Sequence, residues 1–271
     1  MKIGTNRTGA CRLLCVTVCL LTWAERPDLA ERGPASAAIW PEYNLHGDAF
    51  DDWWGPLLDE LPEYQFALYD DAADVVLAEA HTGPLAWDGD DRGLPDGIDA
   101  AMRLVVSGHR AGRAADTLCA FAAEVRPDAR ERGLAGELLR GMSDLAQRHG
   151  LRRLIAPVRP SWKERYPLVP IERYVTWRRD DGQLLDHWMR LHERLGARVA
   201  TPLPRSMLIS GTVAEWESWT GLAFPDSGDY TFPHGLAPVA IDRERDLGTY
   251  WEPNVWIVHP ELTRPDRSTR G

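Results

Sequence analysis

Residues 122–136, which read AAEVRPDARERGLAG, carry the clearest structural signal in this chain. They join an apolar run over 117–125, which predicts a buried strand, to a helix predicted over about 134–149. Pro127 lies between the two and ends the hydrogen-bonding ladder of the strand. A second apolar run over 151–158 follows the helix. The order strand, turn, helix, strand predicts a βαβ unit whose two strands are parallel.

The turn between the first strand and the helix has the features of an anion-binding site. Amides at the start of a helix have no partner within the helix and can hold a phosphate group. Gly133, Ala135 and Gly136 leave room for a diphosphate beside the backbone, and Arg130 and Arg132 add positive charge. Many turns of this kind bind nothing, so the spacing by itself leaves phosphate binding open.

Apolar periodicity predicts further elements on both sides of this unit. These are a helix over 48–61, a hairpin of strands 64–69 and 75–80, helices 98–109 and 184–195, and strands 206–212 and 250–259. Strands that alternate with helices in this way predict an α/β fold with a central, mixed, twisted β-sheet flanked by helices.

The chain is expected to divide into a core and two extensions. Residues 1–38 are expected to form an N-terminal extension, either signal-like or disordered, and 39–212 the core. Within the core, 159–182 mixes prolines and aromatic residues without a regular period, which indicates an ordered insertion or flap. Residues 213–271, rich in tryptophan and proline, are expected to pack on the core as a C-terminal extension.

Composition excludes several classes of protein. The chain has 271 residues with 31 Lys+Arg and 41 Asp+Glu, so its net charge of −10 argues against a general DNA or RNA binder and suits a cationic substrate such as an amine. Sequence signatures of dinucleotide binding, P-loops, serine hydrolases and zinc proteases are absent. We therefore expect no metal.

The N-terminus permits two interpretations. Basic residues followed by an apolar run make residues 1–24 resemble a secretory signal, although the run is too short to span a bilayer. Of the four cysteines only Cys119 lies in the body of the chain, which does not fit a secreted protein stabilised by disulfides. A mis-assigned start codon explains residues 1–24 equally well. The signal-like reading would instead make the chain a secreted, tryptophan-rich binding protein.

Val125-x-Pro127 followed by Arg130-Glu131-Arg132-Gly133-Leu134-Ala135 resembles the motif of the GNAT superfamily of acyl-CoA-dependent N-acyltransferases. The resemblance covers roughly residues 64–212. It implies that the turn grips the diphosphate of coenzyme A, and that the preceding strand binds pantetheine while the Val125 amide stabilises the oxyanion. The cofactor-binding residues would be Val125, Arg130, Arg132, Gly133, Leu134, Ala135 and Gly136. Glu131 departs from the family, where glycine is common.

A second match is LHERLGA at 191–197, similar to the family's helix ending L-Y-E-K-L-G-F. In that motif the tyrosine protonates the departing thiolate, so the resemblance implies this role for His192. Ala197 replaces the usual aromatic residue. A surface or capping histidine on an amphipathic helix is the alternative for His192.

Glu124 is the leading candidate for the general base because it ends an otherwise apolar strand, where burial would raise its pKa. The alternative is that it faces solvent or pairs with Arg126. Glu252 and Trp177 are the candidate substrate-binding residues, Glu252 because it could hold a cation and Trp177 because it lies in the long insertion.

The sequence therefore predicts a cytoplasmic N-acyltransferase, most simply an N-acetyltransferase, that moves an acetyl group from acetyl-CoA to a small amine by direct attack in a ternary complex. We expect no membrane and no DNA partner. Two alternatives stay open. One is a transferase with another donor, either a longer acyl-CoA or an aminoacyl-tRNA, which would bring a tRNA partner. The other is a GNAT-like binding module without catalysis.

Overall fold

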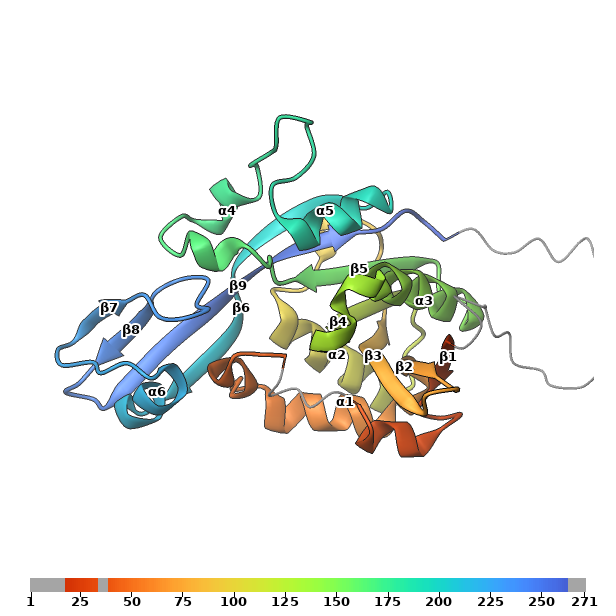
Figure 1. Ribbon diagram of the computed structural model, residues 1–271, viewed down its shortest axis with the longest axis horizontal. Coiled ribbons are helices and arrows are strands. Elements are labelled where there is room, and N and C mark those ends of the chain that lie inside the picture. The colour runs from red at the N-terminus through yellow and green to blue at the C-terminus, as the bar shows by residue number, and fades with distance from the viewer. Residues whose placement is uncertain (1–17, 34–38, 263–271) are drawn as a thin grey trace, which may run out of the picture.

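The computed structural model describes residues 18–33 and 39–262, and these build a nine-stranded mixed sheet flanked by helices (Figure 1). The strands follow the order β1-β2-β3-β4-β5-β9-β8-β7, and β6 pairs with β9 as well. Their bounds are β1 Val18–Thr22, β2 Gln65–Asp70, β3 Val75–Leu85, β4 Thr117–Val125, β5 Arg153–Val158, β6 Arg198–Gly211, β7 Gly228–Tyr230, β8 Val239–Asp242 and β9 Leu247–Val258. The predicted fold class is confirmed.

Six α-helices lie in the described ranges. They are α1 Gly55–Glu60, α2 Ile98–Arg110, α3 Leu134–Arg148, α4 Ile171–Tyr174, α5 His187–Arg194 and α6 Val213–Thr220. A π-helical turn, Phe50–Trp54, runs directly into α1, and a 3-10 turn, Pro127–Arg132, precedes α3. None of the helices in this part of the chain is long and apolar enough to cross a membrane.

Two apolar clusters hold the helices on opposite faces of the sheet. Leu138, Met142 and Leu145 of α3 are buried against one face. Leu57 of α1 and Val105 of α2 are buried against the other face. The central strands are therefore covered on both sides, which explains the near-continuous apolar sequence of β4.

The predicted βαβ unit is confirmed as β4, α3 and β5, and its two strands are parallel. Their pairing is short, because only Thr117 to Cys119 of β4 pair with Arg153 to Ile155 of β5. Beyond this point β4 stays paired with β3, and β5 stays paired with β9. The two strands part between these neighbours, and the opening that results holds the site described below.

The N-terminal extension expected over residues 1–38 needs correction where the structure describes it. Val18–Thr22 is a strand that pairs antiparallel with β2 over its whole length. Leu20 packs on α3, where the backbone of Gly141 approaches so closely that an added Cβ would collide with its side chain. An apolar run after basic residues is compatible with a signal sequence and with an edge strand, which is why the sequence alone did not predict β1.

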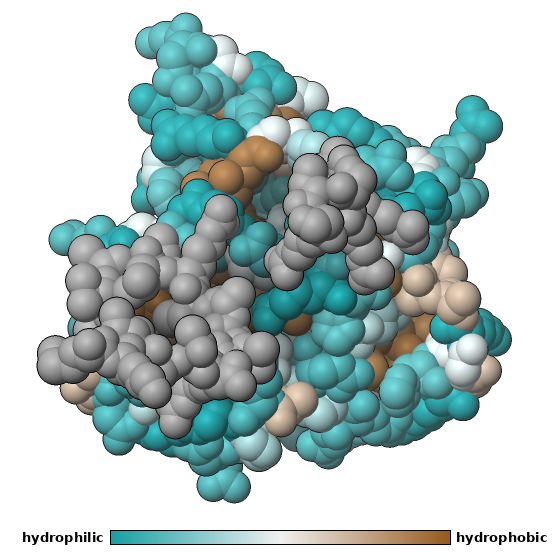
Figure 2. Space-filling model, turned by 90° about the vertical axis from the view of Figure 1, so that its right-hand side faces the viewer, coloured by the Kyte–Doolittle hydropathy of each residue, from teal (hydrophilic) through white to brown (hydrophobic). Residues whose placement is uncertain are grey.

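The molecular face in Figure 2 is mainly hydrophilic.

The C-terminal boundary at residue 213 also needs correction. β9 belongs to this stretch, yet it lies inside the sheet between β5 and β6 (Figure 1). What does extend from the core is a smaller unit of α6, β7 and β8 around its own aromatic cluster, which includes Trp216, Phe232 and Tyr250. Because prolines are frequent in this stretch, the sequence pattern did not indicate that β9 belongs to the central sheet.

Candidate functional site

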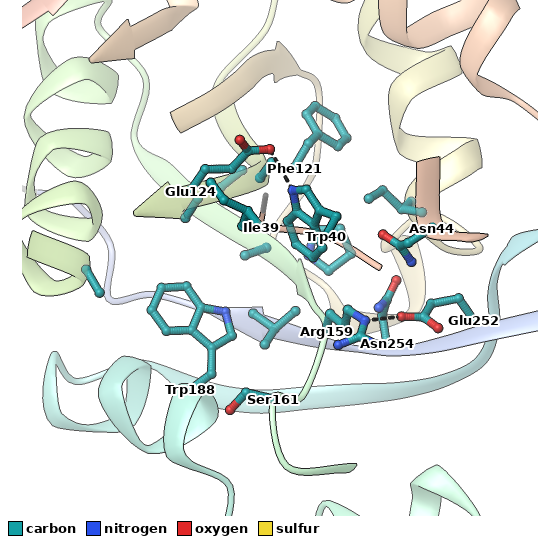
Figure 3. Close-up of a pocket in the computed structure, with 18 of the residues that line it drawn as sticks. Ile39, Trp40, Asn44, Phe121, Glu124, Arg159, Ser161, Trp188, Glu252 and Asn254 are labelled. Carbon is teal, nitrogen blue, oxygen red and sulfur yellow. Dashed lines mark hydrogen bonds and ion pairs between the residues drawn. The ribbon is translucent and has the colours of Figure 1, made fainter. Parts of the chain in front are cut away.

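A cavity of about 720 Å³ opens where β4 and β5 part. Its walls come from the second half of β4, the end of β5 and the start of α3, with further side chains from α5 and β9. Trp40, which follows directly on Ile39, projects into the middle of the cavity (Figure 3). The polar lining residues are Asn44, Glu124, Arg130, Arg159, Ser161, Glu164, Arg165, His187, His192, Glu252 and Asn254.

The turn at the head of α3 lies at this cavity. Gly133 has φ +75°, the left-handed conformation that favours glycine, and separates the 3-10 turn from α3. Val125, Arg130 and Ala135 line the cavity. Arg132 points elsewhere, toward Asp70 at 3.9 Å.

Three other predicted cofactor-binding residues belong to the turn without lining the cavity, namely Gly133, Leu134 and Gly136. Leu134 is buried under the sheet, and the amide of Gly136 donates to the Gly133 carbonyl. Of the residues in the turn, Arg130 and Ala135 line the cavity, and the cofactor-binding roles of Gly133, Leu134 and Gly136 stay predictions.

The Val125 amide faces the opening between the strands. Glu79 and Glu124 are paired residues of the β3–β4 ladder, and the Arg126 amide donates to the Leu77 carbonyl at 3.0 Å. Amides of an antiparallel strand point alternately to its two neighbours. The Val125 N–H, one residue before Arg126, therefore points away from β3 to the side where β5 has parted, as an oxyanion-binding amide requires.

Glu124 is buried, with 2% of its surface exposed, and Trp40 Nε1 donates a 2.6 Å hydrogen bond to its Oε1 (Figure 3). Glu79 lies opposite Glu124 across the β3–β4 pair and is 5% exposed. Burial and the neighbouring charge of Glu124 raise the pKa of Glu79 to about 8. Glu79 therefore keeps its proton at neutral pH. The expectation that Glu124 is buried is confirmed, whereas exposure or pairing with Arg126 is not observed, since Arg126 pairs with Asp128.

Glu252 lines the other side of the cavity, where it is 1% exposed. Its carboxylate accepts hydrogen bonds from Arg159 Nε and the Tyr250 hydroxyl. Arg159 Nη2 in turn donates to the Tyr43 hydroxyl at 2.9 Å and to the His234 carbonyl at 2.7 Å. This network joins Glu252 of β9 to the C-terminal unit. It also places the guanidinium of Arg159, which was not among the residues predicted from sequence, in the wall of the cavity.

His192 lies on the inner face of α5 and is 1% exposed. Its Nδ1 is 2.9 Å from Nε2 of His259, which follows β9. Burial, reinforced by the neighbouring His259, lowers the pKa of His192 well below 6.5, so this imidazole is neutral at pH 7. His192 is thus a buried residue of the cavity wall and not a surface or capping histidine.

Trp177 does not line the cavity, so its predicted role in substrate binding needs correction. Its ring packs edge-on against Tyr166 at 5.0 Å and beside Tyr174 at 5.4 Å, in the segment between β5 and α5. The aromatic residues of this insertion hold the segment together. No group of acidic, histidine or cysteine side chains suited to a metal ion occurs in residues 18–33 and 39–262.

Sequence reasoning missed Trp40, Glu79, Arg159 and His259. Each acquires its place through long-range pairing: Glu79 through strand register, His259 through the position of β9, and Trp40 through a segment far from β4. Local sequence carries no signal of such contacts.

The sequence matches no model of a known protein family. It is 31% identical over 274 residues to the arginine N-acetyltransferase avaD of Aspergillus versicolor, an alignment that covers 89% of this chain and 93% of that protein. The chain belongs to the GNAT superfamily. The resemblance stated from the two motifs is thereby confirmed.

Solved structures support the fold assignment. The loading GNATL domain of CurA from Lyngbya majuscula is 15% identical, with a TM-score of 0.52 over 89% of this chain and 96% of that domain. The GNAT-like decarboxylase GphF, solved in complex with isobutyryl-CoA, is 16% identical, with a TM-score of 0.50 over 91% of this chain and 99% of that one. At these identities the likeness concerns the fold alone.

This GNAT protein is an N-acetyltransferase, and the co-substrate expected from the motif is acetyl-CoA. The cavity fits that co-substrate, because parted strands leave free backbone groups beside an open channel and Arg130 supplies positive charge at the diphosphate end.

Proposed function

We propose that the acceptor of this N-acetyltransferase is arginine or a close analogue that carries both a cationic nitrogen and a carboxylate. The related protein is named for arginine, and the charges of the cavity suit such a molecule. One observation carries the proposal: the cavity presents a buried carboxylate, Glu124, and the guanidinium of Arg159 on opposite sides of Trp40 (Figure 3).

The two ends of the acceptor have separate partners in this proposal. Glu124 attracts the cationic nitrogen, and Arg159, which is 16% exposed, faces the carboxylate. Asn44 and Asn254 line the space near Arg159 and are 8% and 3% exposed, so their amides can complete the polar contacts. Nε and Nη2 of Arg159 already donate to Glu252, Tyr43 and His234, so Nη1 is the nitrogen that donates to the carboxylate in this proposal.

Acetyl-CoA supplies an activated acetyl group as a thioester. The cationic nitrogen first loses one proton to solvent, which frees its lone pair for attack. Glu124 takes the second proton as the C–N bond forms, and the Val125 amide donates a hydrogen bond where negative charge develops on oxygen. Glu79 keeps its own proton at neutral pH, so the Glu79–Glu124 pair holds at most one negative charge. The buried pair thus leaves one carboxylate to act as the base.

We also propose a cytoplasmic location. The donor is an intracellular metabolite, and cleavage after Ala24 would remove β1 from the sheet. Analysis of the N-terminus of the protein isolated from its own cells tests this proposal. A mature form that begins at Glu25 outside the cell would overturn it.

An acceptor series tests the proposed substrate class. Release of free thiol from acetyl-CoA is measured with arginine, with agmatine, which lacks the carboxylate, and with ornithine, which carries an ammonium group in place of the guanidinium. Arginine should give the highest kcat/KM, and agmatine should lose at least about tenfold, the equivalent of one charge-assisted hydrogen bond. Equal kcat/KM for arginine and agmatine would contradict a role for Arg159, and no turnover with any of them would overturn the acceptor class.

A further inference from the structure

Two histidines form a buried pair at the wall of the acetyl-CoA cavity. His192 on α5 and His259 after β9 are 1% and 7% exposed, and their facing nitrogens, Nδ1 and Nε2, are 2.9 Å apart. The ring of Trp188 lies edge-on to His192 at 4.7 Å and borders the cavity (Figure 3). The backbone amide of His259 donates to the Leu154 carbonyl at 3.0 Å, which fixes this residue to the start of β5.

The contact between the rings involves Nδ1 of His192 and does not involve its other nitrogen, Nε2. Nε2 of His192 is buried and has no hydrogen-bond partner among the residues that the structure describes. A buried polar nitrogen without a partner is destabilising unless a ligand satisfies it. Because His192 lines the cavity, a group bound there is the candidate partner for Nε2.

Both rings are neutral at pH 7. Burial lowers the pKa of His259 to about 4, and burial together with His259 lowers the pKa of His192 well below 6.5. The neighbouring charged groups of α5 are directed elsewhere: Glu193 pairs with Arg178, and Arg190 donates to the carbonyls of Leu184 and Leu185. Only one of the two facing nitrogens, Nδ1 of His192 or Nε2 of His259, therefore carries a proton. If Nε2 of His259 carries it, the single N–H of His192 is at Nε2; if Nδ1 of His192 carries it, Nε2 of His192 is unprotonated.

We propose that His259 is a positioning residue: its Nε2–H donates to Nδ1 of His192, and this fixes His192 in the tautomer whose Nε2–H donates a hydrogen bond to the thioester sulfur. The inference rests on acetyl transfer from acetyl-CoA and is independent of which amine accepts the acetyl group.

The proton and electron balance follows from this tautomer. When the new C–N bond forms and the C–S bond breaks, the electron pair of that bond goes to sulfur, and the nitrogen gives its proton to Glu124. His192 keeps its proton and stabilises the negative sulfur as a neutral donor, as a neutral imidazole can where its pKa is low. The motif-based expectation of a proton-donating acid at this position is thus replaced by a hydrogen-bond donor.

Nitrogen-15 NMR of the intact protein, free and with coenzyme A, reads the tautomers directly. We expect His192 to show a protonated Nε2 and an unprotonated Nδ1, and its Nε2 signal to shift when coenzyme A binds. A protonated Nδ1 on His192 would overturn the proposal whatever the activity.

Two substitutions separate positioning from packing. His259→Gln keeps an amide donor near Nδ1 of His192, whereas His259→Met fills the space without a donor. His259→Met should lower kcat about 100-fold, the usual effect of losing one preorganised donor, and leave the Kd of coenzyme A unchanged. His259→Gln should restore most of kcat and the wild-type tautomer.

His149→Phe, at a histidine whose ring lies 4.4 Å from the ring of Tyr64 outside the cavity, is the matched control and should behave as wild type. Should His259→Met unfold the protein, the NMR assignment of the wild type and the His259→Gln variant still decide the matter. Wild-type kcat in folded His259→Met would overturn the proposal.

Discussion

Glu79 on β3 and Glu124 on β4 lie directly opposite each other in the sheet, and each exposes 5% or less of its surface. Two ionised carboxylates are not stable at such a position, because burial and mutual repulsion both disfavour charge. The pKa of Glu79 rises to about 8 in consequence. The pair thereby supplies one ionisable carboxylate, Glu124, to the cavity and keeps the other protonated.

This pairing predicts how stability depends on pH. The pKa of Glu79 is raised from 4.5 to about 8, so its protonated form stabilises the fold fully below pH 4.5 and this contribution is lost as pH rises toward 8. The loss is roughly 1.4 kcal/mol per pH unit within that window. Glu79→Gln should remove this dependence. Denaturant unfolding of both proteins at pH 5 and 8.5 measures the difference, and parallel pH profiles would contradict a protonated Glu79.

Glu124→Gln tests the base. It keeps an acceptor for the Trp40 indole but removes the site for the proton, so kcat should fall about 10²- to 10⁴-fold. The Kd of acetyl-CoA, from calorimetric titration, should stay within about twofold because glutamine keeps the size and the hydrogen-bond acceptor of this side chain. Unchanged turnover would remove Glu124 from the mechanism.

The buried pair of Arg159 and Glu252 predicts a non-additive effect on stability. Arg159→Met leaves Glu252 charged at 1% exposure and should lower the free energy of unfolding by about 3–5 kcal/mol. Adding Glu252→Gln should recover part of that loss, since the unpaired charge is gone. Urea unfolding of the two single variants and the double variant measures the coupling. Additive losses would show that the pair is not coupled.

Two arginines of the turn are predicted to differ in their contribution to donor binding. Arg130 lines the cavity, whereas Arg132 is directed toward Asp70. Arg130→Ala should raise the Kd of acetyl-CoA about tenfold, by loss of a charge-assisted contact to phosphate, and Arg132→Ala should raise it less than threefold. Raising the salt concentration should reduce the difference in the Kd of acetyl-CoA between Arg130→Ala and the wild type. Equal Kd values for the two variants would contradict this placement of the diphosphate.

Strand β1 predicts that residues 18–22 are needed for folding. A protein that begins at Glu25 loses the strand that pairs with β2 and uncovers Phe66 and the helix surface at Gly141. It should be largely insoluble or melt well below the full chain. A control that begins at Arg12 keeps β1 and should melt with the full-length protein. Equal melting of the protein that begins at Glu25 would show that β1 is dispensable.

The βαβ unit could be predicted from sequence because its information is local. The signals follow one another along the chain from β4 to α3. The apolar run indicates a strand, the proline ends it, and the glycine precedes an amphipathic helix. The burial of Glu124 could be predicted for the same reason, because a charged residue at the end of an otherwise apolar strand is conspicuous in the sequence.

Other parts could not be predicted because their meaning is set by distant partners. Val18–Thr22 is apolar enough for a signal sequence until β2 pairs with it, and β9 is interrupted by Pro253 although it lies inside the sheet. Trp177 is an aromatic residue in a long insertion, which is typical of a ligand contact, but its ring packs against Tyr166 and Tyr174. His259 gains a role only because β9 brings it to α5.

The most direct test is the product formed by the purified full-length protein from acetyl-CoA and arginine, with the Glu124→Gln variant in parallel. Mass spectrometry should find arginine that carries one acetyl group, formed in step with free coenzyme A, and the variant should form it at least about 100-fold more slowly. Release of coenzyme A without acetylated arginine, or equal rates in the two proteins, would contradict the account.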